Sequence, residues 1–145
     1  NVLGVVNALT KEVITFSNTT YITAETIVDF LKQLKEYYGD MPLKIVLDNA
    51  RYQHCKLVEA AAKQLNITLL FLPSYSPNLN IIERLWKFTK KKILYAKYYE
   101  TPHKFHTAIT DFFQTINEKH NADLNKLLTL KFQFFKNQPA EIYPV

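Results

Sequence analysis

The sequence predicts one domain of the α/β class, and three observations lead to this prediction. The chain has 145 residues, of which 48% are hydrophobic, and this is enough to build one core. Short apolar runs alternate with segments whose apolar residues recur at helical spacing. Only two glycines, no low-complexity tract and no internal repeat are present, so we expect few flexible linkers.

The first elements are expected to be a hairpin and a helix. Residues 1–9 and 12–17 are rich in Val, Ile and Phe and are joined by the polar residues 10–11, as in a β-hairpin. Thr23 is a suitable N-cap for a helix that reaches about Tyr38, where Gly39 ends it. The apolar residues of this helix share one face and are Ile27, Phe30, Leu31, Leu34 and Tyr38.

Two apolar runs, 43–47 and 67–72, are predicted to be strands with both faces covered, and Pro73 stops the second. A helix predicted over 54–65 separates them, which implies parallel strands joined by a right-handed crossover. A helix over about 79–95 follows, and the spacing of Phe105, Ile109, Phe112 and Ile116 predicts another beyond Pro102. The predicted order is β-β-α-β-α-β-α-α, with a shorter helix around Leu124, Leu127 and Leu128.

Composition excludes several classes of protein. The apolar runs are far shorter than a membrane span, and no charged segment followed by a long apolar stretch opens the chain, so we expect a soluble protein that is not exported. The single cysteine, Cys55, excludes an internal disulfide and a cysteine-based zinc site and agrees with a reducing cytoplasm. A net charge of +5 is a mild indication of a polyanionic partner.

Two acidic residues separated by 34 residues, Asp48 and Glu83, are the candidate catalytic and metal-binding residues. Asp48 ends the strand 43–47, where open α/β sheets place ligands, and Glu83 opens the helix after the next strand. Plain structural explanations exist, because an Asp often closes a turn and a Glu often stabilises a helix N-terminus. If the acids converge to about 4 Å, their repulsion is on the order of 4 kcal/mol at an effective dielectric of 20, and a cation relieves it. Oxygen ligands favour Mg²⁺ or Mn²⁺, and two such ions can drive displacement at a phosphodiester.

Basic residues without any acid occupy the stretch from residue 84 to residue 97. A charge run alone is typical of a solvated helix face, but its position directly after Glu83 favours contact with DNA. Trp86 lies in the apolar stripe, so core packing is the better explanation for it than stacking on a base. The aromatic residues of 95–99 and 132–135 are likewise expected in the core or in a dimer contact. The candidate nucleic-acid contacts are Arg51, His54, Arg84, Lys87, Lys90 and Lys91.

The segments IVLDNARYQ and LPSYSPNLNIIERLW resemble the mariner-like superfamily of DDE transposases, including its bacterial insertion-sequence branch. The resemblance is strongest from residue 45 to residue 92. It implies a ribonuclease H-like mixed sheet flanked by helices, with Asp48 and Glu83 as the second and third members of an acidic triad. It also implies Mg²⁺ or Mn²⁺, cleavage of DNA at element ends, transfer of the 3′-hydroxyl to target DNA, a homodimer, and a place in the bacterial cytoplasm at the nucleoid. Pro73, Ser74, Pro77 and Asn80 would shape the loop that presents Glu83.

The first acid of such a triad lies on the first strand of the fold, and residues 1–9 correspond to the second. Asp29 and Asp40 are expected within a helix and in its following turn, so neither replaces it. We therefore expect residues 1–145 to be one catalytic domain, incomplete at its N-terminus and inactive alone, with about 100–145 as a helical extension. Either the first strand comes from a preceding segment or another chain, or strands 1–9 and 43–47 pair directly. An inactive remnant that binds DNA or dimerises, and another ribonuclease H-like nuclease, are the alternatives.

Overall fold

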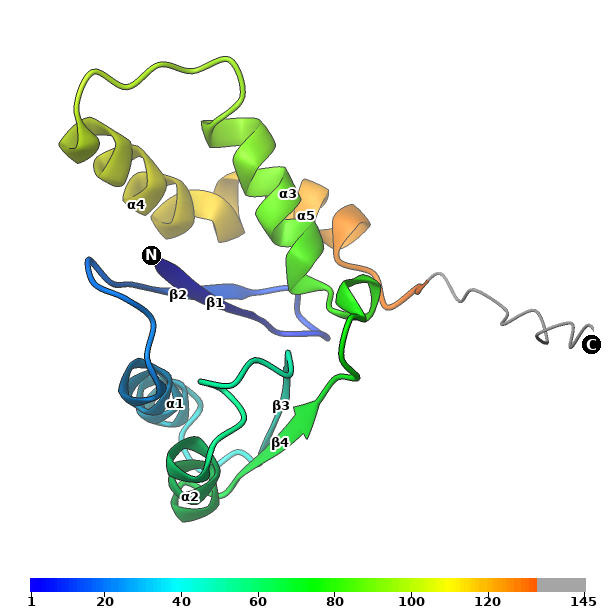
Figure 1. Cartoon of the computed structure of the whole chain (residues 1–145). Helices are drawn as coiled ribbons and strands as arrows, with labels where there is room; N and C mark the ends of the chain where they lie inside the picture. Colours follow the sequence, from blue (N-terminus) through cyan, green and yellow to red (C-terminus); the bar gives the residue numbers. More distant parts are fainter. Residues whose placement is uncertain (133–145) are drawn as a thin grey trace, which may run out of the picture.

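Four short strands and their covering helices form a mixed α/β fold in the computed structural model, which describes residues 1–132 (Figure 1). The predicted order of elements is confirmed. The strands are β1 (Val2–Val6), β2 (Val13–Ser17), β3 (Leu43–Leu47) and β4 (Ile67–Phe71). The helices are α1 (Ala24–Tyr38), α2 (Lys56–Gln64), the short 3₁₀ helix η1 (Pro77–Leu79), α3 (Ile82–Ile93), α4 (Pro102–Lys119) and α5 (Asn121–Leu127).

The hairpin is antiparallel, but its strands are shorter than the sequence predicts. Val2 pairs with Ser17 and Val6 with Val13. The side chain of Asn7 accepts hydrogen bonds from the backbone of Leu9 and Thr10, at 3.0 and 3.1 Å, and this turns the chain before residue 9. The connection therefore occupies residues 7–12 instead of only 10–11.

Strands β3 and β4 are parallel and α2 connects them, as predicted. Helix α1 begins with a capping box between Thr23 and Thr26, and Gly39 follows it with a φ of 60°, which favours glycine. The predicted apolar face of α1 is buried against the strands and α2. In this first core α1 meets Val58 and Ala62 of α2, Ile45 of β3 and Ile67 of β4.

A second core covers the opposite face of the hairpin. Leu85 of α3, Ile116 of α4 and Leu124 of α5 are almost fully buried there against Val13 of β2. Figure 1 shows α3, α4 and α5 on one side of the hairpin and α1 and α2 on the other. The hairpin is thus apolar on both faces, which is the pattern of strands in the middle of a sheet.

The single mixed sheet is the main point on which the described residues differ from prediction. They form two separate two-stranded sheets, β1 with β2 and β3 with β4. Direct pairing of the strand at residues 1–9 with the strand at 43–47 is therefore wrong. Both sheets still pack on the first core, through Leu3 and Val5 on one side and Leu43 and Leu47 on the other. Each of β1 and β3 keeps one unpaired edge among residues 1–132.

Several helix boundaries are corrected, and part of the C-terminal prediction is not covered. Helix α2 starts at Lys56 instead of His54, and α3 runs over Ile82–Ile93 with η1 before it. The extension predicted for 100–145 is helical over α4 and α5, whereas residues 133–145, including Phe134 and Phe135, lie outside the described residues. Within residues 1–132 no helix has the length and apolarity needed to cross a membrane.

Candidate active site

Asp48 follows β3 directly and is half-buried at the carboxyl end of the parallel sheet. The side-chain amide of Asn80 donates a hydrogen bond of 2.8 Å to its Oδ1 atom. Asn80 lies in the connection between β4 and α3, so this contact joins the ends of two neighbouring strands. The sequence predicted that Asn80 shapes this loop, but its contact with Asp48 is a tertiary feature.

Asn80 also holds the start of α3, where Glu83 lies. Its backbone carbonyl accepts from the N–H of Glu83 at 3.2 Å, and its side-chain oxygen accepts from the N–H of Ile82 at 3.3 Å. These bonds satisfy amides that would be left without partners at the helix N-terminus. One asparagine therefore connects the Asp48 carboxylate to the helical turn that carries Glu83.

Glu83 is half-buried and lines a groove of about 400 Å³ between β1, α3 and α4. Apolar side chains, including Trp86 and Phe113, form much of its wall, and Lys90 borders it. Trp86 packs edge-on against Phe113, with ring centroids 6.0 Å apart, as part of the second core. This agrees with the expectation that Trp86 serves packing.

A second connection ties the same two loops. The amide nitrogen of Asn49, the residue after Asp48, donates to the Oγ of Ser74 at 3.3 Å. Ser74 follows β4 by three residues and precedes η1. The loop that bears Asp48 and the loop that leads to Glu83 are thus joined at two points.

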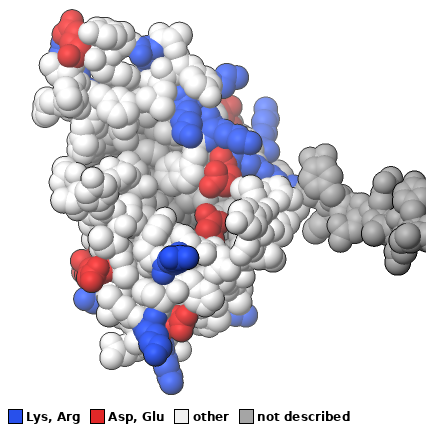
Figure 2. Space-filling model, viewed as in Figure 1, with Lys and Arg blue, Asp and Glu red and all other residues white. Residues whose placement is uncertain are grey.

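The lysines of α3 lie on its exposed side, and Lys87, Lys90 and Lys91 all face solvent. Figure 2 shows basic side chains gathered over the part of this face where α3 lies, next to acidic side chains. Lys92 differs from them, since its ammonium group lies 5.4 Å from the ring centroid of Phe88. The predicted row of positive charge beside Glu83 is present in the folded chain. Arg51 is also exposed, in the turn after Asp48.

Arg84 has a different environment from these lysines. Its guanidinium donates to the backbone carbonyls of Thr129 and Lys131, both at 2.7 Å, and to that of Leu127 at 3.4 Å. The group also lies 5.5 Å from the ring centroid of Phe132. Its donors are therefore engaged by the segment that follows α5. Sequence reasoning missed this role because carbonyl acceptors carry no sequence signal.

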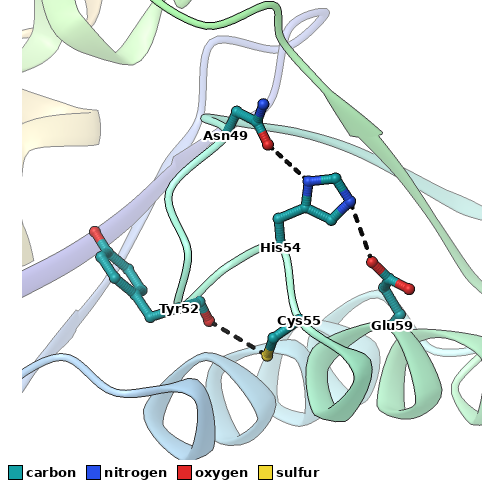
Figure 3. A network of polar contacts seen from close by, with 5 residues as sticks. All are labelled: Asn49, Tyr52, His54, Cys55 and Glu59. Carbon is teal, nitrogen blue, oxygen red and sulfur yellow. Dashed lines mark hydrogen bonds and ion pairs between the residues drawn. The ribbon is translucent and has the colours of Figure 1, made fainter.

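His54 is likewise engaged within the protein (Figure 3). Its ring stacks on Phe71, the last residue of β4, with centroids 4.1 Å apart and an interplanar angle of 13°. Its Nδ1 atom lies 2.6 Å from the Oδ1 of Asn49, and its Nε2 atom lies 3.3 Å from the Oε1 of Glu59. Both ring nitrogens thus already have partners in the chain.

The two carboxylates have the ligand chemistry that a hard divalent cation prefers, but two side chains are fewer than the three of an acidic triad. Asp48 and Glu83 offer oxygen ligands, which Mg²⁺ and Mn²⁺ prefer. Among residues 1–132, however, no group of three His, Cys, Asp or Glu side chains is placed to hold a metal ion. Asp29 is exposed on α1, 3.6 Å from Lys32, and Asp40 is exposed in the following turn, so neither joins the pair.

Comparison with known proteins identifies the family. The sequence model of the family described as DDE superfamily endonuclease matches residues 1–106. The chain belongs to this superfamily. Its members generally use divalent metal ions, which agrees with the two carboxylates. No curated protein sequence matches the chain.

Among solved structures, this DDE superfamily chain is similar to a chain of the simian T-cell lymphotropic virus intasome in complex with PP2A regulatory subunit B56 gamma, determined by cryo-EM. The two are 17% identical with a TM-score of 0.60, and the match covers 81% of this chain and 42% of the other. At this identity the likeness concerns the fold alone. The chain spans less than half the length of that relative.

Proposed function

We propose that this domain is the catalytic core of a transposase that cleaves DNA strands and transfers a 3′-hydroxyl end to target DNA. Membership of the DDE superfamily sets the class of chemistry. The observation that carries the proposal is the Asn80 amide bonded to Asp48, because it brings the Asp48 carboxylate to the turn that carries Glu83. The two motifs that contain these residues favour the mariner-like, bacterial insertion-sequence branch.

In this proposal Asp48 and Glu83 hold Mg²⁺ or Mn²⁺. These two residues would hold the ions, which would supply activation of a water or a 3′-hydroxyl and stabilisation of the leaving oxygen. The chain itself orients the ligands, since Asn80 donates to the Asp48 carboxylate and accepts from the N–H of Ile82, the first residue of the helix of Glu83. The exposed lysines of α3 would bind the DNA phosphates that flank the scissile bond.

The domain needs one further strand and one further acid. We infer that the unpaired edges of β1 and β3 pair with a strand placed between them, which would join the two small sheets into a ribonuclease H-like sheet. An acidic residue on that strand would complete the triad beside Asp48. On this basis residues 1–132 alone are expected to be inactive.

A nicking assay tests the assignment. Supercoiled plasmid carrying the element ends is incubated with Mn²⁺, the domain and a polypeptide that supplies the proposed acid-bearing strand. Asp48→Asn and Glu83→Gln keep the shape of each side chain and are expected to reduce nicking to background, because a neutral amide is a poor ligand for a hard cation. Asp29→Asn, on α1, is the matched control and should nick normally. Full activity in either site variant would refute the assignment.

DNA binding can be tested separately from cleavage. Lys87, Lys90 and Lys91 are proposed phosphate contacts, with Arg51 beside Asp48 as a further one. Each phosphate contact contributes roughly 0.9 to the slope of log affinity against log salt on duplex DNA. Gel-shift titrations should therefore show a slope that falls by about one for each lysine changed to alanine. A slope that is unchanged in the triple variant would show that DNA binds elsewhere.

A second candidate is an inactive remnant that binds DNA or dimerises. The lack of a third acid among residues 1–132 favours it. This alternative predicts salt-dependent DNA binding but no nicking, even when the acid-bearing strand is supplied. The leading proposal predicts both DNA binding and nicking. A homodimer, and residence in a bacterial cytoplasm at the nucleoid, are further parts of the proposal, which sedimentation analysis and cell imaging can test.

A further inference from the structure

The segment from Asp48 to Cys55 is a compact turn that needs external contacts to keep its place. Within it, the N–H groups of Gln53 and His54 donate to the Ala50 carbonyl at 2.9 and 2.8 Å. The thiol of Cys55 also lies 3.8 Å from the Tyr52 carbonyl (Figure 3). These bonds stiffen the turn internally, but they do not connect it to the rest of the fold.

Three contacts attach this turn to β4 and to the loop that follows it. Asp48 accepts from Asn80, Asn49 donates to Ser74, and the His54 ring lies on Phe71 of β4. His54 takes part in the last contact and reinforces the second, because its Nδ1 atom meets the same Asn49 side chain that bonds Ser74.

The far side of the ring is held by Glu59, one turn into α2. This pair is weak by itself, since the His54 and Glu59 side chains are 48% and 49% exposed. The stack on Phe71 and the 2.6 Å contact with Asn49 are the stronger attachments. His54 is therefore enclosed by an aromatic ring, an amide and a carboxylate, each from a different element.

We propose that His54 is a positioning residue: it holds the Asn49 side chain against Ser74 and so keeps Asp48 in place beside the loop of Glu83. This role rests on the proposed function of Asp48 as a metal ligand. It differs from the role expected from the sequence, in which His54 contacts phosphate. Removing a group that orients a metal ligand typically lowers metal affinity about 10-fold to 100-fold.

His54→Phe is the informative variant, because a phenyl ring keeps the stack on Phe71 and loses the hydrogen bond to Asn49 and the contact with Glu59. His54→Asn can return a donor near the Nδ1 position and should restore part of the effect. Glu100→Gln is the matched control, since Glu100 and Lys104 form a pair of comparable exposure, 67% and 60%, on the connection to α4. Glu59→Gln should behave almost like wild type.

The first readout is hydrogen exchange of the metal-free chain. His54→Phe is expected to speed exchange in residues 48–55 and 72–80 several-fold, while exchange in α1 stays the same, and Glu100→Gln is expected to change neither loop. This result does not depend on catalysis. Unchanged exchange in both loops would overturn the proposal.

The second readout is metal dependence, from Mn²⁺ titrations followed by electron paramagnetic resonance and from the nicking assay. His54→Phe should raise the half-saturating Mn²⁺ concentration about tenfold and leave the rate at saturating Mn²⁺ within about threefold of wild type. A lower DNA affinity with unchanged Mn²⁺ dependence would overturn the positioning role and favour phosphate contact. If Asp48→Asn nicks normally, the proposed function itself is refuted. The hydrogen-exchange measurement still tests whether His54 holds the two loops in place, because it does not depend on catalysis.

Discussion

Asn80→Asp should destabilise the protein, because it acts on the bond to Asp48. The substitution replaces the amide nitrogen with oxygen and leaves the shape of the side chain unchanged. The donor that lies 2.8 Å from the Asp48 carboxylate becomes a second carboxylate oxygen. The variant therefore exchanges an attraction for a repulsion without altering packing.

The size of the effect follows from two contributions. A hydrogen bond to a charged group contributes roughly 1.5 to 3 kcal/mol, and the lower end applies here because both residues are half-buried. Two carboxylates about 4 Å apart repel by about 1 kcal/mol in bulk water and about 4 kcal/mol at an effective dielectric of 20. With about 1.5 kcal/mol from repulsion, the free energy of unfolding falls by about 3 kcal/mol. This corresponds to a Tm lower by roughly 10 °C.

The loss should depend on pH in a definite direction. A proton shared by the two carboxyl groups removes the repulsion, and the folded variant binds that proton more readily than the unfolded chain. The stability deficit is therefore smallest near pH about 4 and grows toward pH 7. Mn²⁺ should also recover more stability in this variant than in the wild type, since a cation offsets the repulsion.

Thermal unfolding followed by circular dichroism measures these effects. Asn80→Ala loses the bond to Asp48 and the acceptor for the N–H of Ile82 but adds no charge, so it should show at least about half of the deficit and little pH dependence. Asn125→Asp is the control for added charge, because its amide donates to Asn121 and not to a carboxylate. A Tm for Asn80→Asp within about 1 °C of wild type at pH 7 would refute the contact on which the site depends.

Three further changes test other contacts. Gly4→Ala places a Cβ atom 2.8 Å from the Trp86 ring, so we expect a loss of about 1–3 kcal/mol and a shifted fluorescence of this single tryptophan; unchanged stability would contradict the close approach. Arg84→Lys replaces the planar guanidinium with a compact ammonium group, which cannot reproduce bonds made from two separate nitrogens; cleavage by proteases after α5 should therefore rise, while DNA affinity falls less than in Lys87→Ala. The hydrogen bond from Tyr37 to Glu12 raises the pKa of the Tyr37 phenol above its ordinary value of 10.0. This bond stabilises the folded chain fully below pH 10.0, and its contribution is lost as pH rises through the raised pKa. Tyr37→Phe should therefore flatten the loss of stability above pH 10, and an identical pH profile would contradict the contact.

Local elements were accessible from the sequence because their signals are local. The apolar face of α1, its Thr23 cap and the glycine after it all appear in one stretch of chain. The parallel pairing of β3 and β4 followed from the helix between them. The position of Asp48 at the end of β3 could likewise be predicted, since it depends only on where an apolar run stops.

The division of the sheet could not be read from residue patterns alone. Strand β1 is apolar on both faces, which predicts a covering layer on each face. Which strands pair with its two edges depends instead on which backbone segments lie beside it. Among residues 1–132 only β2 forms strand hydrogen bonds with β1. The same cause moved the hairpin turn, where the side chain of Asn7 redirected the backbone before the apolar run ended.

For the charged and polar side chains, some roles could be predicted from the sequence and others became apparent only in the folded structure. The sequence alone predicted the carboxylate pair, a preference for a hard cation and the basic helix beside it, because these predictions follow from residue type and helical spacing. Only the tertiary structure assigned Arg84 to the carbonyls after α5, His54 to Asn49 and Phe71, and Asn80 to Asp48. All of those contacts except the one between His54 and Asn49 join segments distant in the chain, and Arg84 bonds backbone carbonyls that every residue carries, so no local pattern of side chains specifies them in advance.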